Sequence, residues 1–272
     1  MTRRIQLGGR LRRLREARGI TRADAGYAIR SSESKISRME LGRVGFKERD
    51  IADLLTLYGV TDPADRLPIL ELAAEANRPG WWQEYPDLIP PWMTTYLGLE
   101  EAASLLRVFA PQFVPDLLQT EDYARALLRV AHPKASPEEL DTRITILRRR
   151  QLAFFRPDGP RLWAVLDESV LHRPVGPPEV HQAQLTHLLN LKGVILQILP
   201  FSAGAHPATA GPFTLLRFPH PDLPDTAFTH TLTSSTHHDH PTSLDTHLQT
   251  MEHLCVLADP PATTPTHLTP TP

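Results

Sequence analysis

The first sixty residues hold four short helical patterns, and three of them end at a glycine. The patterns span residues 5–18, 21–28, 33–41 and 47–58. In the first and the last, apolar residues recur three and four positions apart, as on one face of an amphipathic helix. Gly19, Gly42 and Gly59 follow the first, third and fourth patterns, where glycine commonly ends a helix. This region is therefore predicted to form a small all-α domain.

A turn of three or four residues separates the second and third helical patterns. Thr21 is placed to cap the second helix, with Asp24 three positions on as a variant of the capping box, and Ser32 is placed to cap the third. Gly26 lies inside the second helix, where glycine costs about 1 kcal/mol relative to alanine, so a neighbouring helix is expected to approach it closely. This arrangement is typical of a helix-turn-helix unit, whose recognition helix enters the DNA major groove.

The charge of the chain is divided between its two ends. Residues 1–49 contain 14 Lys and Arg against 5 Asp and Glu, a balance of +9, whereas the remaining 223 residues sum to −11. A basic head on an acidic body predicts that a small segment binds a polyanion while the rest does something else. The alternative is a solvated basic surface without a ligand.

The basic head resembles the Cro/CI (XRE) family of helix-turn-helix regulators. The resemblance rests on residues 21–29, TRADAGYAI, and 34–43, SKISRMELGR, and extends over about residues 5–60. It implies that Ile36 and Met39 face the core.

Two positions depart from the family's usual pattern. Arg30 stands where the turn between the helices commonly has glycine, so the turn is either strained or one that tolerates arginine. Glu33 stands where such proteins often use glutamine to read adenine. Its carboxylate can accept a hydrogen bond from cytosine N4 but repels phosphate.

Seven residues are predicted to contact double-stranded DNA. Four of them would lie toward base edges or flanking phosphates: Glu33, Ser34, Lys35 and Arg38. Three would hold phosphates: Arg22, Ser32 and Arg43. Glu40 is expected instead to pair with an arginine and brace the domain. Because one such domain buries little DNA, a homodimer on a pseudopalindrome is expected.

The residues after position 58 predict one more helix and then a second domain. The first domain is expected to span residues 1–78, where Arg78 and the following Pro and Gly break the helix. Trp81, Trp82 and Trp92 follow within twelve residues. Such dense aromatics are expected to form a hydrophobic plug, with a ligand-lined pocket or a partner surface as the alternative.

The second domain mixes two periodicities. Helices are predicted at 99–109, 121–130, 137–155, 179–191 and 244–257, and strands at 161–167, 193–200 and 212–218, with a further strand around Phe228 and Leu232. Residues 259–272 are predicted to be a disordered Pro/Thr tail. The fold class is therefore α+β: an all-α helix-turn-helix domain followed by an α+β domain over 79–258.

The second domain resembles the C-terminal domain of actinobacterial WhiJ-like (Scr1-type) regulators. The resemblance rests on FVPDLLQTEDYAR from residue 113, LWAVLDE from 162 and LPFSAGAHP from 199, and runs from about Gly80 to Phe218. It implies a domain of poorly defined role, in regulators whose genes often sit beside one for a small acidic partner protein. No catalytic residue is carried over from that family.

Several classes of protein are disfavoured by what the chain lacks. Cys255 is the only cysteine, which excludes an intramolecular disulfide and fits a reducing compartment. No secretory signal and no run of about 18 apolar residues occurs, so a cytoplasmic, nucleoid-associated protein without a membrane partner is expected. Motifs of nucleotide-binding loops and serine hydrolases are absent, so we expect no enzyme and no cofactor.

The histidines at 237, 238 and 240, with His247 and His253, could supply imidazole to a metal ion. Adjacent histidines point apart, however, so no physiological metal site is predicted.

The sequence thus predicts a sequence-specific DNA-binding transcriptional regulator whose second domain serves dimerisation, sensing or partner binding. An alternative is an antitoxin-like interaction switch that binds the small acidic partner and autoregulates. A third is a sensor gated by a small-molecule effector near the tryptophans.

Overall fold

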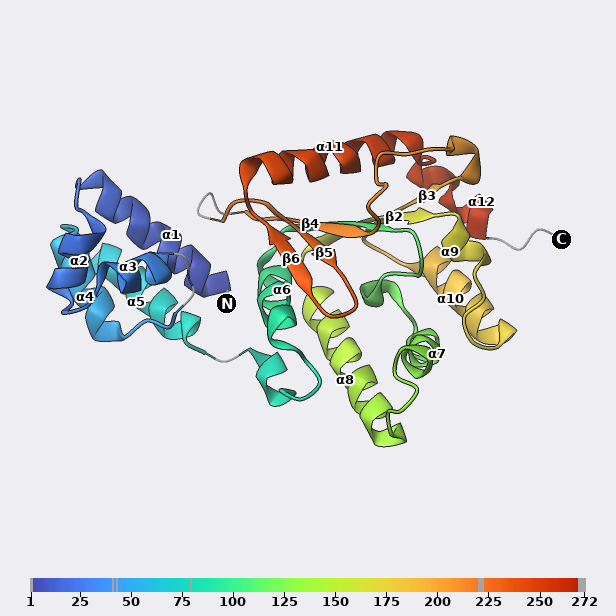
Figure 1. The fold of residues 1–272 in the computed structure, drawn as a ribbon, viewed down its shortest axis with the longest axis horizontal. Helices are drawn as coiled ribbons and strands as arrows, with labels where there is room; N and C mark the ends of the chain where they lie inside the picture. Colours follow the sequence, from blue (N-terminus) through green and yellow to red (C-terminus); the bar gives the residue numbers. More distant parts are fainter. Residues whose placement is uncertain (1, 41, 43, 79, 220–222, 269–272) are drawn as a thin grey trace. The chain divides into compact units, whose positions relative to one another are not determined.

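The computed structural model describes residues 2–40, 42, 44–78, 80–219 and 223–268, and the chain forms two compact units (Figure 1). The first unit comprises Met1–Ala102 with Phe218–Pro224, and the second Ala103–Arg217 with Asp225–Pro272. The predicted boundary at residue 78 lies inside the first unit. There the Trp81 indole donates a hydrogen bond to Glu101 Oε1 at 2.8 Å, tying the tryptophan segment to a later helix of the same unit.

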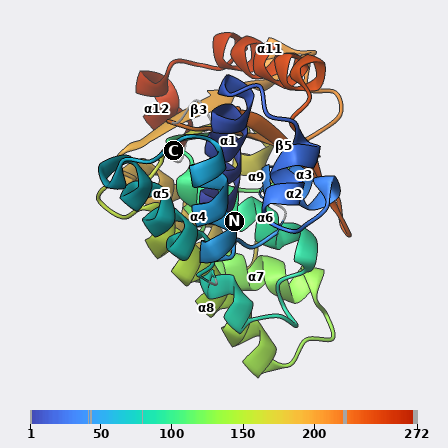
Figure 2. The same ribbon diagram turned by 90° about the vertical axis from the view of Figure 1, so that its left-hand side faces the viewer.

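The described part of the first unit is helical. Its elements are α1 (Thr2–Ala17), α2 (Arg22–Ala28), α3 (Glu33–Glu40), α4 (Glu48–Leu57), α5 (Pro63–Ala76), the 3-10 turn η1 (Trp81–Glu84) and α6 (Pro91–Ala102). The four helical patterns of the sequence correspond to α1–α4. Figures 1 and 2 both show α2 and α3 side by side, packed against each other.

Apolar side chains from all five helices α1 to α5 meet in the core of this unit. Leu11 of α1, Ile36 of α3 and Ile51 of α4 are each no more than 1% exposed, and Ile69 of α5 joins them. A β-carbon at Gly8 would overlap the carbonyl oxygens at the end of α3, so glycine lets α1 cross α3 closely. Packing against this core fixes the position of α3 and leaves the opposite face of the helix exposed.

The second unit is built on a six-stranded mixed sheet of order β3-β2-β1-β4-β5-β6. The strands are β1 (Leu105–Ala110), β2 (Arg161–Asp167), β3 (Val194–Leu199), β4 (Phe213–Arg217), β5 (Thr226–His230) and β6 (Ser235–His238). β1, β2 and β3 run parallel, and β4, β5 and β6 add antiparallel neighbours. Together with the helical first unit, this sheet confirms the predicted α+β class.

Helices lie on both sides of the sheet (Figure 1). They are α7 (Glu121–Ala131), α8 (Pro137–Phe154), α9 (Ser169–His172), α10 (Pro178–Asn190), α11 (Pro241–Leu257) and α12 (Thr264–Leu268), with 3-10 turns η2 (Asp116–Leu118), η3 (Phe201–Ala203) and η4 (Pro261–Thr263). Met251 and Leu254 of α11 pack on Phe109, Val165 and Leu215 of the sheet, all buried. Figure 1 shows α7 and α8 on the opposite side.

The prediction of one helix over 99–109 is wrong. α6 ends at Ala102, and Leu105–Ala110 forms β1, which lies between β2 and β4 in the sheet. A central strand with helices on both faces of its sheet, as β1 is between parallel β2 and antiparallel β4, is largely buried and reads as a near-continuous apolar run. Such a run also satisfies helical spacing, so the two interpretations could not be separated by periodicity.

The segment predicted as a disordered tail is folded up to Leu268. Asp259 donates its backbone N–H to Ile198 O at 2.9 Å, and the Thr264 hydroxyl donates to Leu196 O at 2.6 Å. Leu268 is 1% exposed. Composition alone did not reveal that this Thr-rich segment finds hydrogen-bond acceptors along β3; residues 269–272 lie outside the described residues.

None of the described helices combines the length and the apolar character that crossing a lipid bilayer requires.

Candidate nucleic-acid interface

The turn between α2 and α3 is held by caps and by close backbone contact. Thr21 Oγ1 accepts the Asp24 N–H at 3.1 Å, as expected for an N-cap, and its hydroxyl donates to the Asp24 carboxylate at 2.6 Å. A β-carbon at Gly26 would lie 2.9 Å from Ser31 O and 3.0 Å from Ser32 C. The close approach expected at Gly26 is therefore made by the backbone of the turn.

Arg30 occupies the turn with a left-handed backbone, φ 54°. Among the described residues it is the only non-glycine with a positive φ. Its N–H donates to Tyr27 O at 3.0 Å and the Ser31 N–H donates to Gly26 O at 2.8 Å, which closes the end of α2. The strain expected from the missing glycine is thus visible as a conformation that costs L-residues about 1–2 kcal/mol.

Helix α3 has a buried side and an exposed polar side. Ile36 and Met39 are each 1% exposed, in agreement with their predicted core role. Glu33, Ser34 and Arg38 are exposed. The Arg38 Nε donates to Ser34 O at 3.3 Å, which lays the guanidinium along the helix surface.

Ser32 and Lys35, two of the predicted DNA contacts, make contacts within the protein. Ser32 Oγ accepts the Lys35 N–H at 3.2 Å as the N-cap of α3, so its hydroxyl hydrogen is still available to an acceptor. The Lys35 ammonium lies 2.6 Å from Asp50 Oδ2 on α4, with 28% of the side chain exposed. Lys35 thus joins α3 to α4, which the sequence did not predict.

Glu40 at the end of α3 is the acceptor of a buried ion-pair network. Its carboxylate accepts from Arg15 Nε and Nη2 at 2.5 and 3.1 Å, and from Arg22 Nε at 3.0 Å. The Glu40 side chain is 2% exposed. The hydrogen bond with Glu40 raises the pKa of Arg15 above its ordinary value, against the opposing effect of burial. The predicted bracing role of Glu40 agrees with this geometry.

Arg22 is therefore shared between the protein and the solvent. Its Nε binds Glu40, while 38% of its side chain is exposed at the start of α2. Arg43, the remaining predicted phosphate contact, lies outside the described residues.

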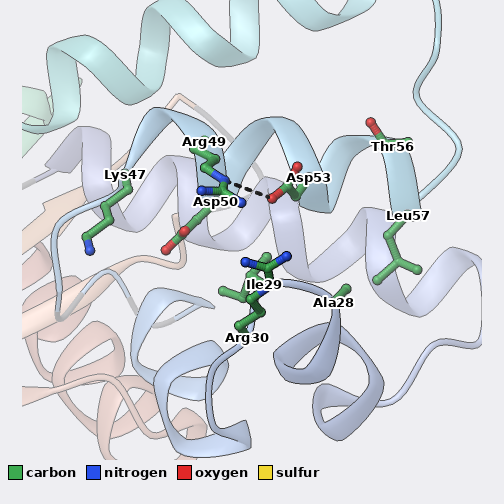
Figure 3. Close-up of a pocket in the computed structure, with 9 residues that line it drawn as sticks. All are labelled: Ala28, Ile29, Arg30, Lys47, Arg49, Asp50, Asp53, Thr56 and Leu57. Carbon is green, nitrogen blue, oxygen red and sulfur yellow. Dashed lines mark ion pairs between the residues drawn. The ribbon is translucent and has the colours of Figure 1, made fainter.

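An open groove of about 610 Å³ lies between the α2–α3 turn and α4 (Figure 3). Figure 3 shows Arg30, Lys47 and Arg49 around it together with Asp50 and Asp53. The Arg49 Nε lies 3.8 Å from Asp53 Oδ2. Because the groove carries both signs of charge, its lining does not by itself indicate a polyanion site.

The tryptophan segment packs edge to face. The Trp81 and Trp82 ring centroids lie 5.8 Å apart at 75°, and Trp82 is 5% exposed. This packing favours the predicted hydrophobic plug.

The histidine segment forms no metal cluster in the described part of the chain. There, no group of three or more His, Cys, Asp or Glu side chains is placed to hold a metal ion.

Comparison with known families covers most of the chain. A family model described as Domain of unknown function (DUF5753) matches residues 93–269, more than half of the chain. The chain belongs to this DUF5753 family. A second family model, described as Helix-turn-helix domain, matches residues 6–68. No curated protein and no solved structure matches this DUF5753 chain.

The two family matches place a helix-turn-helix DNA-binding domain before a domain of unknown function. Within the first, sequence reasoning missed Arg15 as the main partner of Glu40 and Asp50 as the partner of Lys35. The signal for Arg15 was its place next to the apolar stripe of α1, where a buried charge requires a partner. Asp50 carried no comparable signal, because α3 and α4 are brought together only by the fold.

Proposed function

We propose that this protein is a sequence-specific transcription regulator that reads DNA with α3 in the major groove. The observation that carries the proposal is the two-sided character of α3 within a helix-turn-helix unit. Ile36 and Met39 anchor the helix in the core, and its exposed side holds hydrogen-bonding groups alone. That is the arrangement a recognition helix needs, because base edges are read by donors and acceptors.

The exposed residues of α3 have distinct roles in this proposal. Arg38 donates to guanine, Ser34 binds either a base edge or a phosphate, and Glu33 accepts from cytosine N4. Ser32 and Arg22 hold phosphates at the starts of α3 and α2, which the exposed part of Arg22 supports. Lys35 contributes positive charge beside the DNA major groove while it remains paired with Asp50. The function requires no turnover.

We further propose that two copies act together on one operator. A single recognition module buries roughly 600–1,000 Å² on DNA, which is little for tight specific binding. A two-fold dimer reads half-sites about 34 Å apart, or a multiple of this distance. The second unit then supplies dimerisation, sensing or the surface for a partner protein. Sedimentation of the protein with and without its operator measures the stoichiometry directly.

The test begins with selection of bound sequences from a random duplex library. Fluorescence anisotropy then compares the selected duplex with a scrambled one of equal length at about 150 mM salt, where specific binding should exceed non-specific binding by at least about 10³. Arg38→Ala should cost about 1–3 kcal/mol on the selected duplex and little on the scrambled one.

Arg129→Ala is the matched control, because it removes an equal charge from the exposed surface of α7. It should leave both affinities unchanged. Equal, weak binding to both duplexes by the unmodified protein would contradict direct readout by α3.

A further inference from the structure

The second unit contains a buried arginine in the middle of its sheet. Arg107 lies on β1 and is 7% exposed. Its guanidinium carbon lies 4.8 Å from the centroid of the Trp163 ring, over the ring face. Its Nη2 lies 3.3 Å from the Sγ of Cys255 on α11.

In the part of the chain that the structure describes, no carboxylate neutralises the charge of Arg107. Among the described residues, none of the ion pairs involves Arg107, and its Nε is buried without a hydrogen-bond partner. A buried cation without an anionic partner is costly, and a buried donor without an acceptor adds to the cost. A stacked tryptophan offsets part of this cost but does not use the N–H groups.

Nε–H, the donor of Arg107 that has no acceptor, lies beside Nη2, the donor that contacts sulfur. Nε–H and Nη2–H lie along one edge of the planar guanidinium and form the fork that binds paired acceptors. Here one prong of the fork contacts Cys255 Sγ and the other has no acceptor. An oxygen atom attached to that sulfur would lie within reach of the unused N–H.

Cys255 itself is held in place and partly exposed. The Gln197 side chain donates to Cys255 O at 3.1 Å and to Asp259 O at 3.0 Å, and its own oxygen accepts the Trp163 indole N–H at 2.7 Å. Trp163 therefore links two residues that contact Cys255. It stacks on Arg107 and donates a hydrogen bond to Gln197, which in turn fixes the backbone carbonyl of Cys255. The next residue, Val256, is 80% exposed, so solvent reaches this turn of α11.

We propose that Cys255 is a thiol that reacts with hydroperoxides, and that Arg107 binds the resulting sulfenate. The guanidinium contacts the sulfur at 3.3 Å through Nη2, and the thiolate is the nucleophile. The sulfur attacks one oxygen of hydrogen peroxide, forming an S–O bond while the O–O bond breaks. Sulfur is oxidised by two electrons, the peroxide is reduced, and the departing hydroxide takes a proton to become water. The new oxygen accepts from Arg107 Nε–H.

The fate of the oxidised sulfur follows from the composition of the chain. Cys255 is the only cysteine of the 272 residues, so no disulfide can form within one chain. The sulfenate persists until an external thiol reduces it or forms a mixed disulfide with it. The chemistry of this site does not depend on the proposed DNA-binding function.

The first measurement compares native and urea-unfolded protein treated with dilute hydrogen peroxide and a dimedone-type probe. Mass spectrometry of the peptide that contains Cys255 reports the sulfenate, because no other cysteine competes. We expect native protein to be labelled about tenfold faster than the unfolded chain, since Arg107 is adjacent only in the fold. Slower labelling in the native state would show a merely shielded thiol and would overturn the proposal.

Two variants separate the effect of the Arg107 charge from the effect of its paired N–H donors. Arg107→Met should slow labelling by about tenfold or more. Arg107→Lys, which keeps the charge but loses the paired donors, should form sulfenate but convert it faster to sulfinate. Arg129→Met is the control and should behave like the unmodified protein. Each variant is first compared by near-UV circular dichroism, and unchanged labelling in folded Arg107→Met would refute the assignment.

Discussion

Arg30 shows how a single residue stores strain in the reading unit. Its left-handed backbone joins α2 to α3, and the hydrogen bonds at the end of α2 hold it there. Glycine adopts this conformation without the clash that a β-carbon causes. The surrounding structure therefore compensates for a conformation that the residue itself disfavours.

Replacing Arg30 by glycine should stabilise the first unit by up to about 1 kcal/mol. The gain is smaller than the relieved strain, because glycine has more freedom in the unfolded chain. Hydrogen exchange of the α2 and α3 amides measures the change. Arg30→Ala is the control: it also removes the charge but retains the β-carbon, so an equal gain in both variants would mean that charge, rather than backbone strain, matters.

Glu40 should be far more sensitive to substitution. Glu40→Gln removes the buried anionic partner of Arg15 and leaves it the half-exposed Glu16 at 3.4 Å, which should destabilise the first unit by about 3–5 kcal/mol. Asp53→Asn removes an exposed pair with Arg49 and should cost at most about 0.5 kcal/mol. Urea denaturation followed by exchange of the α1 and α3 amides compares the two variants, and similar losses would argue against a buried network.

At the scale of elements, sequence patterns located most of the helices. They also located β2, β3 and β4 to within a residue or so at each end. Thr21 and Ser32 predicted the starts of α2 and α3 because a cap is a local interaction between neighbours in the chain. β1 could not be recognised in this way, because its strand conformation depends on pairing with β2 and β4, which are distant in sequence. Local chemistry was predictable, and long-range pairing was not.

The β5–β6 hairpin is joined to α11 through one imidazole. His238 Nε2 lies 3.0 Å from Thr229 Oγ1, and His238 Nδ1 lies 3.0 Å from Ser243 Oγ. The ring of His247 lies 4.6 Å away, centroid to centroid. Burial is the largest cause that lowers the pKa of His238 below 6.5, followed by His247 and His237, while Asp239 acts in the opposite direction.

The second unit should therefore lose stability in mild acid. A lowered pKa means that the unfolded chain binds the proton of His238 first, so the stabilisation is present above pH 6.5 and is lost as the pH falls through the folded-state pKa. Thermal unfolding at about pH 7.5 and about pH 5.5 should show a smaller acid-induced drop in Tm for His238→Gln than for the unmodified protein. An equal drop in both would assign the effect to other histidines.

At the scale of the whole molecule, the positive charge is concentrated in the first 49 residues, but the fold decides which cations remain available. Arg15 is buried in its ion pair with Glu40, and Lys35 is paired with Asp50. Arg22 binds Glu40 while part of its side chain is exposed to solvent. The sequence predicted a basic, DNA-binding head and its recognition helix. It predicted that Glu40 pairs with an arginine, but it identified neither Arg15 as that partner nor Asp50 as the partner of Lys35, because these partners come from separate helices.

The salt dependence of DNA binding counts the cations that contact phosphate. Arg22→Gln keeps a hydrogen-bond donor for Glu40 but removes the charge, so the slope of log affinity against log salt should fall by about 1 on every duplex. Anisotropy titrations at several salt concentrations measure this slope. Arg129→Gln should leave it unchanged, and an unchanged slope for Arg22→Gln would remove Arg22 from the phosphate contacts.

Residues 259–268 lie along β3, an edge strand of the sheet that pairs with β2 on its other side. β3 reads Val-Ile-Leu-Gln-Ile-Leu, a segment of high β-propensity without charge. Without residues 259–268, its carbonyl groups would form an open template for identical strands from other copies. By composition this segment reads as low-complexity sequence, but it covers the edge of β3 and so opposes the addition of further strands. A chain truncated after Ala258 should therefore be less soluble and more prone to self-association.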